Sequence, residues 1–398
     1  MATAKVRPMT KRDLAQAERI WVTSYLIESP EASKQIRARM RMADCRALEV
    51  DGAVHAVGRL LPLKVTLNGR VFDFGAVAWL ATAPESRRRS YMQELLLDML
   101  REMRERGMVL SGLYPFDSGF YRRYGWALAD DVTMIELPAR YLTVRGRLPG
   151  RVVDIGIKDV KTLMKLHAEW GARYNSSVVR DRWWFERYVL YDGVPGASPR
   201  YTYRYDAPNG TPEGYVMYRY LSGTAPVRVQ DFVALTPRAR AGLLAFLGDL
   251  DSQSKTIQFL LPADDPLRAT VERFDELREE RRSKDQVMLR IVDVAGVFTG
   301  WKLPGGDAAL VMSVDDPHAR WNRGGWKLSI TNGKSKIARS KATADCRASI
   351  QTLAQLVAGF LAPEAAVDAG LVTGPRAEKI GLIERFSGGR TPFHNDYY

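Results

Sequence analysis

Residues 77–92 read Val-Ala-Trp-Leu-Ala-Thr-Ala-Pro-Glu-Ser-Arg-Arg-Arg-Ser-Tyr-Met, and an amphipathic run follows them. The apolar stretch Val77–Thr82, bounded by Ala-Pro, predicts a strand. The next apolar side chains recur at the spacing of one helical face, which predicts a helix: Met92, Leu95, Leu96, Met99, Leu100 and Met103. The turn between them carries Arg87, Arg88 and Arg89 beside the free backbone N–H groups of the helix start. Such a turn favours the binding of an anion.

Three consecutive arginines are also compatible with an ordinary solvated loop, so the interpretation as an anion site needs a second stretch of sequence to support it. Residues 113–126 read Leu-Tyr-Pro-Phe-Asp-Ser-Gly-Phe-Tyr-Arg-Arg-Tyr-Gly-Trp. The motif at 83–90 resembles the Arg-x-x-Gly-x-Gly/Ala pyrophosphate loop of the GNAT acetyltransferase superfamily, and the stretch at 113–126 resembles the segment after the fifth strand in its Eis (enhanced intracellular survival) branch. The resemblance covers the whole chain of 398 residues, which ends in an aromatic residue as Eis chains do.

This resemblance implies an α/β (α+β) fold with tandem GNAT-like domains, mixed central sheets and a C-terminal sterol-carrier-protein-like α+β domain. It places a catalytic GNAT acetyltransferase domain at residues 1–147, a second, non-catalytic GNAT-like domain at 148–294, and the sterol-carrier-protein-like domain at 295–398. It also implies that the C-terminus reaches the active site and that the chain forms a homohexamer.

The hydrophobic pattern suits this order of domains. Alternating apolar stretches joined by Asp-Gly and Asn-Gly turns predict strands at 45–50, 54–67 and 71–82. We expect a strand at 131–137 to close the first domain. The second region partly repeats the pattern, but its turn at 237–242 lacks the Arg-x-x-Gly-x-Gly/Ala spacing, which argues against a second cofactor site. In the third region, Asp345 is expected to cap a helix.

The composition limits the classes of binding partner that the sequence suggests. The formal net charge of +13 calls for an anionic partner without identifying it. The basic residues are spread along the chain and show no zinc-finger, helix-turn-helix or RNA-binding aromatic pattern, which argues against nucleic acid. The 2 cysteines and 4 histidines are isolated in sequence and suggest neither a disulfide framework nor a metal site. No apolar window could span a bilayer and no signal peptide is evident, so we expect no membrane association and a cytoplasmic protein.

The resemblance also implies roles for particular residues in acetyl transfer from acetyl-CoA to a primary amine. Backbone groups of Leu80, Ala81 and Thr82 would pair with the pantetheine arm. The segment Arg87, Arg88, Arg89, Ser90, Tyr91 and Met92 would hold the pyrophosphate, and Trp79 would contact the substrate. Tyr121 would protonate the departing thiolate, and the carboxylate of Tyr398 would help to deprotonate the amine. By their residues alone, Tyr121 and Tyr124 are equally good candidates, and packing is an alternative role for both.

Two departures from the family pattern leave alternatives open. Ser90 and Met92 stand where the family loop has Gly and Gly/Ala, and we expect Ser90 to cap the helix instead and to weaken coenzyme A binding. Asp396 and His394 are reserve candidates for the base. The acceptor could be an aminoglycoside, a polyamine or a lysine side chain. The alternative from a different class is a non-catalytic acyl-CoA-binding or other ligand-binding protein with a degenerate site.

Overall fold

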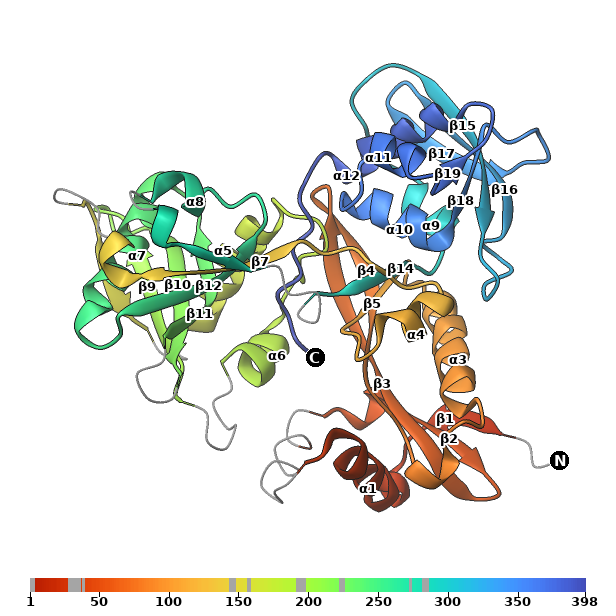
Figure 1. The fold of residues 1–398 in the computed structure, drawn as a ribbon, viewed down its shortest axis with the longest axis horizontal. Helices are drawn as coiled ribbons and strands as arrows, with labels where there is room; N and C mark the ends of the chain where they lie inside the picture. The colour runs from red at the N-terminus through yellow and green to blue at the C-terminus, as the bar shows by residue number, and fades with distance from the viewer. Residues whose placement is uncertain are drawn as a thin grey trace. The chain divides into compact units, whose positions relative to one another are not determined.

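The computed structural model describes residues 4–27, 37, 40–142, 148–155, 159–190, 198–221, 226–271, 274–280 and 286–398. Glu28, Glu31 and Arg145–Arg147 lie outside these residues. The chain forms two compact units (Figure 1). The first unit comprises Met1–Asp130, Gln286–Arg390 and Tyr398, and the second comprises Asp131–Asp285 and Thr391–Tyr397.

The N-terminal part of the first unit is built on a mixed sheet of 7 strands, in which only β4 and β5 are parallel. In spatial order the strands are β1 (Lys5–Pro8), β2 (Cys45–Val50), β3 (Ala53–Leu67), β4 (Arg70–Thr82), β5 (Leu110–Leu113), β14 (Met288–Ile291) and β6 (Ala127–Leu128). The helical elements are η1 (Lys11–Asp13), α1 (Leu14–Tyr25), η2 (Met42–Asp44), η3 (Pro84–Ser86), α3 (Tyr91–Glu105) and α4 (Ser118–Arg123). The predicted strands and the helix after the arginine turn are therefore present, within a residue or two.

Helices α1 and α3 cover opposite faces of this sheet (Figure 1). Leu48 and Leu80 belong to the core cluster that includes the α3 side chains Leu95 and Met99. Their neighbours along the strands, such as Ala47 and Ala81, belong to the cluster beneath α1. Because successive strand residues point to opposite faces, this alternation is what divides the two layers.

The two sheets of the tandem domains exchange strands, which the sequence reading did not foresee. The strand expected at 131–137 is present as β7 (Val132–Pro138), but it pairs with β12 of the second sheet and not with the first. In its place β14 enters the first sheet between β5 and β6. Both strands are rich in apolar residues and largely buried. A continuous apolar run predicts a buried strand, but it does not name the sheet that the strand joins.

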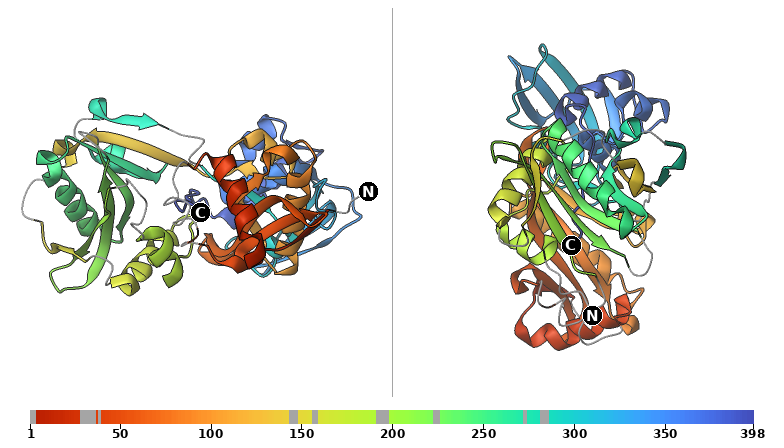
Figure 2. Two further views of the ribbon diagram at one scale, coloured as in Figure 1. Left: turned by 90° about the horizontal axis from the view of Figure 1, so that it is seen from below. Right: turned by 90° about the vertical axis from the view of Figure 1, so that its left-hand side faces the viewer.

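The second unit is built on another mixed sheet of 7 strands, in which β11 and β12 are parallel. In spatial order its strands are β13 (Arg278–Glu280), β7, β12 (Thr256–Pro262), β11 (Val227–Ala234), β10 (Pro212–Tyr220), β9 (Tyr201–Asp206) and β8 (Arg151–Asp154). Its helical elements are η4 (Ala139–Leu142), α5 (Val160–Gly171), α6 (Arg182–Trp184), the π-helical η6 (Phe185–Val189), α7 (Pro237–Gly248), η7 (Asp249–Ser252), α8 (Leu267–Thr270) and η8 (Phe274–Glu276). The twist of the strands within each sheet is clear in Figure 2.

The C-terminal domain lies within the first unit and contains a sheet of 5 strands. Its strands, in spatial order, are β17 (Lys334–Arg339), β16 (Gly324–Thr331), β15 (Ala308–Asp315), β18 (Cys346–Ser349) and β19 (Val372–Thr373). Its helices are α9 (Val294–Phe298), α10 (Ile350–Ala358), α11 (Pro363–Asp368), η10 (Ala377–Ile383) and α12 (Glu384–Ser387). The predicted cap was wrong: Ser349 caps α10, whereas Asp345 accepts from the N–H of Val311 at 2.8 Å.

A buried ion pair ties the C-terminal domain to the first sheet. Arg290 on β14 is fully buried, and its Nη2 donates to both carboxylate oxygens of Asp316 at 3.0 and 3.1 Å. Gly125 lies against this guanidinium with a φ of +97°, and a Cβ at that position would overlap Arg290 Nη1. A glycine is therefore required both by the backbone conformation and by the space that the arginine occupies.

We expect Gly125→Ala to destabilise the first unit more than a left-handed glycine replacement in open space. The matched control is Gly52→Ala, because Gly52 has a φ of +79° and nothing lies within 4 Å of the added Cβ. Both variants carry the conformational penalty, on the order of 1 kcal/mol, but only Gly125→Ala also crowds Arg290, at a further cost of about 1–3 kcal/mol. Urea unfolding measures both variants. Equal losses would show that Arg290 moves freely and that the contact carries no constraint.

Candidate active site

Strand β4 leaves its parallel neighbour before it ends. The pairing of β4 with β5 covers only Phe74–Ala76 against Leu110–Gly112, whereas β4 continues to Thr82. Its other edge stays paired with β3 as far as Thr82. Within the described part of the chain, the last 6 residues of β4 therefore have a strand partner on one side only. An edge of this kind offers backbone donors and acceptors to an extended ligand.

The backbone at the start of this open edge is irregular. Trp79 has a φ of +53°, and the β3–β4 register shifts between Val57 and Arg59, which marks a bulge. Trp21 Nε1 donates to the Trp79 carbonyl at 2.8 Å, and the hydroxyl of Tyr25 donates to the Leu80 carbonyl at 3.1 Å. Because a carbonyl oxygen has two lone pairs, Leu80 can still accept a second hydrogen bond.

Aromatic rings from α1 line this edge. Tyr25 lies 5.2 Å from Trp79 between ring centroids, and Trp21 lies 6.5 Å from Trp79 in an edge-on contact. Tyr25 is 46% exposed, and the desolvation of its hydroxyl, which donates to β4, raises its pKa above the ordinary tyrosine value. The sequence reading missed Tyr25, although a signal was available: Trp21 and Tyr25 are four residues apart on a predicted helix and so share one face.

The arginine turn lies at the end of the same strand. Arg87, Arg88 and Arg89 are all exposed, and the first N–H groups of α3 follow directly, beginning with Tyr91. At the start of an α-helix these groups have no intrahelical acceptor. The corresponding turn of the second unit is closed instead, because Thr236 caps α7 and Arg238 is ion-paired with Glu213. The first turn therefore has no side-chain cap at its helix start, whereas the second has both a cap and a carboxylate partner for Arg238.

Ser90 does not cap α3. Its side chain makes no capping hydrogen bond, and its backbone adopts φ +61° and ψ +9°. This is the left-handed conformation that glycine adopts without cost, so the family's glycine is explained by backbone geometry here. The expectation that Ser90 acts as a helix cap was therefore wrong, because a residue in this conformation does not direct its hydroxyl at the N–H groups of the first turn.

The structure separates Tyr121 from Tyr124. Tyr121, on α4, is 3% exposed and contacts the rings of Phe116 and Phe120 at 5.4 and 5.2 Å. Burial raises its pKa well above the ordinary tyrosine value, and the phenol of Tyr25 and the carboxylate of Asp117 raise it further. Tyr124 instead packs against His318 of the C-terminal domain, at 5.2 Å. Tyr121 is therefore the tyrosine that interacts electrostatically with Tyr25, one of the rings beside the open edge of β4.

The chain terminus divides between the two units. Tyr398 belongs to the first unit, where its ring lies 5.5 Å from that of Tyr114, just beyond β5. The sequence reading did not single out Tyr114. Thr391–Tyr397 belong to the second unit.

Both reserve candidates for the base are used to dock this tail. Asp396 accepts hydrogen bonds from Arg180 Nε at 2.8 and 3.1 Å and from Trp184 Nε1 at 2.6 Å. His394 Nδ1 lies 2.8 Å from the Ser176 carbonyl. Burial raises the pKa of Asp396, although the charge of Arg180 opposes this, and lowers the pKa of His394 to about 4. Their contacts are structural ones inside the second unit.

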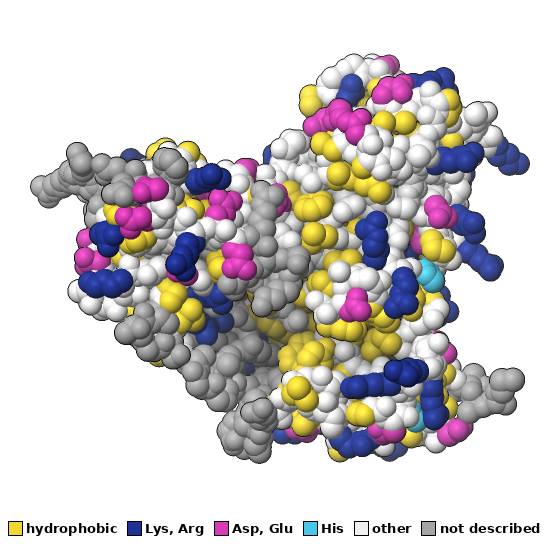
Figure 3. Space-filling view, in the orientation of Figure 1, with side chains coloured by type: hydrophobic (Ala, Val, Ile, Leu, Met, Phe, Trp, Pro, Cys, Tyr) yellow, Lys and Arg dark blue, Asp and Glu magenta, His cyan; other side chains and the backbone are white. Residues whose placement is uncertain are grey.

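Charge on the surface is distributed. Figure 3 shows Lys and Arg side chains spread over the visible face of both units, with Asp and Glu side chains between them. The structure contains no helix long and apolar enough to cross a membrane among its described residues. No group of three or more potential metal ligands gathers among those residues either.

Comparison with known proteins relates each part of the chain to a family. The family model described as acetyltransferase (GNAT) domain matches residues 5–129, another model with the same description matches 176–291, and the sterol carrier protein domain model matches 295–395. These matches confirm the predicted fold class and the order of its domains.

Relatives that match over most of the chain are also described as N-acetyltransferases. An uncharacterized N-acetyltransferase of Streptomyces griseus is 24% identical and covers 99% of both chains. The N-acetyltransferase Eis of Mycobacterium tuberculosis is 23% identical, covering 88% of this chain and 90% of the relative. Eis1 from Mycobacterium abscessus has the same fold, with a TM-score of 0.81 at 21% identity and full coverage of both chains. A GCN5-related N-acetyltransferase from Anabaena variabilis gives a TM-score of 0.89 at 20% identity, again over both whole chains.

The buried histidines of the second unit predict a dependence of its stability on pH. His167 and His394 have pKa values lowered from 6.5 to about 3 and about 4 by burial. A lowered pKa means that the stabilisation is present above pH 6.5 and is lost as the pH falls toward the folded value. We expect His394→Gln to reduce the loss of unfolding free energy between pH 6.5 and 4.5 by about 2 kcal/mol.

Amide hydrogen exchange in peptides from α5 and from the tail, corrected for the intrinsic effect of pH, measures this. His318→Gln is the control, since His318 lies in the other unit. If His394→Gln and the wild type lose protection in parallel as the pH falls, titration of His394 does not govern the docking of the tail.

Proposed function

We propose that this chain, which is an Eis-like acetyltransferase of the GNAT superfamily, transfers the acetyl group of acetyl-CoA to a primary amine. The acceptor would be a small molecule, such as an aminoglycoside or a polyamine, or a lysine side chain. The observation that carries the proposal is the combination, in the first unit, of an open strand edge, an exposed arginine turn at a helix start and a buried tyrosine.

The residues of the first unit fit acetyl-CoA in two ways. The backbone of Leu80, Ala81 and Thr82 would pair with the amide groups of the pantetheine arm, because this edge lacks a second strand. The N–H groups of Tyr91 and Met92 would bind the pyrophosphate, with the exposed arginines supplying positive charge. Bound acetyl-CoA supplies a thioester carbonyl that a neutral amine can attack.

Tyr121 would supply the proton for the leaving group. The amine lone pair attacks the thioester carbon, the C–S bond breaks, and the thiolate takes the phenolic proton. Because burial raises the pKa of Tyr121, the phenol keeps its proton throughout the neutral range. The carboxylate of Tyr398 would accept the proton of the amine. An ordinary α-carboxylate has a pKa of about 3.5 and is a weak base, so it would act through desolvation or a water molecule.

Release of free thiol from acetyl-CoA, measured over a panel of polyamine, aminoglycoside and lysine-peptide acceptors, tests the reaction and both roles. We expect Tyr121→Phe to lower kcat about 100-fold or more, whereas Tyr124→Phe, at a ring that packs against His318, should change it only a few-fold. Wild-type kcat in Tyr121→Phe would remove this tyrosine from the mechanism.

The terminal carboxylate needs a variant that preserves the ring. We expect a single glycine added after Tyr398 to lower kcat strongly, because the extension keeps the contact with Tyr114 and moves the carboxylate. Deletion of Tyr398 should be at least as severe. An extended chain with unchanged kcat would show that the carboxylate takes no part. Coenzyme A binding without turnover on any acceptor would favour the non-catalytic alternative.

We expect Ser90→Gly to tighten coenzyme A binding several-fold and to raise stability by about 0.5–1 kcal/mol, because glycine adopts the left-handed backbone without strain and removes a Cβ beside the arginine turn. Ser90→Ala is the control, since it keeps the Cβ and the strain. Isothermal titration with coenzyme A and thermal unfolding measure the two effects. Equal affinities in Ser90→Gly and Ser90→Ala would show that the serine Cβ does not limit binding.

A further inference from the structure

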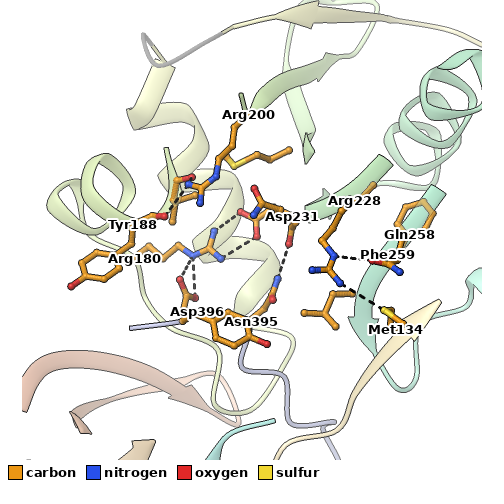
Figure 4. Close-up of a pocket in the computed structure, with 16 residues that line it drawn as sticks. Met134, Arg180, Tyr188, Arg200, Arg228, Asp231, Gln258, Phe259, Asn395 and Asp396 are labelled. Carbon is orange, nitrogen blue, oxygen red and sulfur yellow. Dashed lines mark hydrogen bonds and ion pairs between the residues drawn. The ribbon is translucent and has the colours of Figure 1, made fainter. Parts of the chain in front are cut away.

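The second unit contains a cavity of about 330 Å³ (Figure 4). It lies where β11 leaves β12: the two strands pair only over Val227–Val229 and Ile257–Phe259, and the cavity is lined by residues at this point and just beyond it, among them Asp231 and Leu260. The place corresponds in topology to the divergence of β4 from β5. Its helix turn is closed by Thr236 and Glu213, however, so the cavity cannot repeat the chemistry of the first site.

Part of the cavity lining is apolar. Six apolar residues from five segments contribute to it: Met134, Val189, Met217, Val229, Phe259 and Leu260. A volume of about 330 Å³ holds roughly ten non-hydrogen atoms, at about 30 Å³ for each water-sized group. The cavity therefore suits a small organic molecule with an apolar body.

The charged side chains of the lining carry more cations than anions: Arg180, Arg200 and Arg228 against Asp231 and Asp396. Both carboxylates are held by Arg180. Its Nη2 donates to Asp231 Oδ1 at 3.0 Å and its Nε to Asp396 Oδ1 at 2.8 Å, as Figure 4 shows. The negative charge of the cavity is thus already engaged by one buried guanidinium.

Arg228 is placed differently. Its Nε donates to Gln258 Oε1 at 2.8 Å, and its Nη2 lies 4.0 Å from the sulfur of Met134, so both contacts are with neutral side chains (Figure 4). Gln258 lies between Arg228 and Glu136, because its Nε2 donates to Glu136 at 3.0 Å. Arg200 donates to the carbonyls of Tyr188 and Val189. The guanidinium of Arg228 can therefore receive an anionic group without displacing a carboxylate partner.

We propose that this cavity binds an organic anion, with a carboxylate or a similar group on Arg228 and a short apolar body against the six apolar side chains. The C-terminal tail is part of the site, because Asn395, Asp396 and Tyr397 form one wall of the cavity. An occupied cavity holds this wall in place, and with it the residue that follows, Tyr398. The effect on catalysis rests on the proposed function, whereas the binding itself does not.

Octanoate and octanamide are the probes, because they differ in charge and share the same apolar body. In isothermal titration of the full-length chain, we expect octanoate to bind at least tenfold more tightly than octanamide. Arg228→Met should abolish this difference. Arg182→Met is the matched control: Arg182 is in the same unit and is solvent-exposed, pairs with Glu186 and lies outside the lining. Equal binding of the two probes, or octanoate binding unchanged by Arg228→Met, would overturn the proposal; the latter would place the octanoate elsewhere, for example in the C-terminal domain.

Carboxypeptidase digestion tests the link to the tail without any acetyl transfer. We expect octanoate to slow the release of Tyr398 several-fold in the wild type and in Arg182→Met, and to have no effect in Arg228→Met. Binding with no protection would refute the coupling to the tail while leaving the site. Because neither measurement uses acetyl-CoA, their failure is distinguishable from a failure of the proposed function. Circular dichroism and the Tm of each variant verify that it is folded.

Discussion

The early end of the β4–β5 pairing is the constraint on which the first unit depends. Two glycines stand where the strands are still paired, and each is required by close packing: a Cβ on Gly75 would overlap Met103 of α3, and one on Gly112 would overlap Phe74. Beyond them β4 is held only from the β3 side, and the bulge at Trp79 turns the strand further. The arginine turn follows at the end of the same strand, and the rings of Trp21 and Tyr25 from α1 pack against Trp79 on it. A β5 paired along the full length of β4 would occupy the edge that we propose for the pantetheine arm.

The sequence was sufficient for most elements of this fold because the signals were local. Alternating apolar residues with Asp-Gly and Asn-Gly turns predicted the β2–β3–β4 meander, and the spacing from Met92 to Met103 predicted α3. Membership of a sheet is not a local property, so β7 was assigned to the first sheet although it pairs in the second. The role of Ser90 was missed for a related reason: a serine before a helix usually caps it, and only the backbone conformation shows that this one does not.

The candidate site was accessible from the sequence only through the family resemblance. Spacing alone could not choose between Tyr121 and Tyr124, which are three residues apart, the first on α4 and the second at its C-cap. What separates them is the electrostatic effect of Tyr25 on Tyr121 and the ring contact of Tyr124 with His318, and both Tyr25 and His318 come from distant parts of the chain. The same holds for Asp396, whose carboxylate is available as a base in the sequence but is bound by Arg180 and Trp184 in the fold.

Arg180 shows why a buried ion cluster is retained in the second unit. Placing one arginine and two aspartates in a core costs desolvation energy, and an apolar substitute could be equally stable. Tyr215 adds a hydrogen bond to Asp231 at 3.0 Å, which helps to satisfy the oxygens of that carboxylate. An apolar contact would tolerate a tail shifted by a residue, whereas the fixed geometry of a guanidinium between two carboxylates accepts only one register.

The exchange of β7 and β14 has a consequence for how the chain is made. The first sheet is completed by Met288–Ile291, which pair with β5 and β6 only after the whole of the second domain has been synthesised. Until then β5 has an unpaired edge, and the nascent first domain presents it to other chains on the ribosome. Completion of the first sheet is therefore delayed by the translation of the second domain. The first sheet thus depends for its completion on the synthesis of the second domain, and a ribosome that stalled within that domain would release a chain whose first sheet is incomplete.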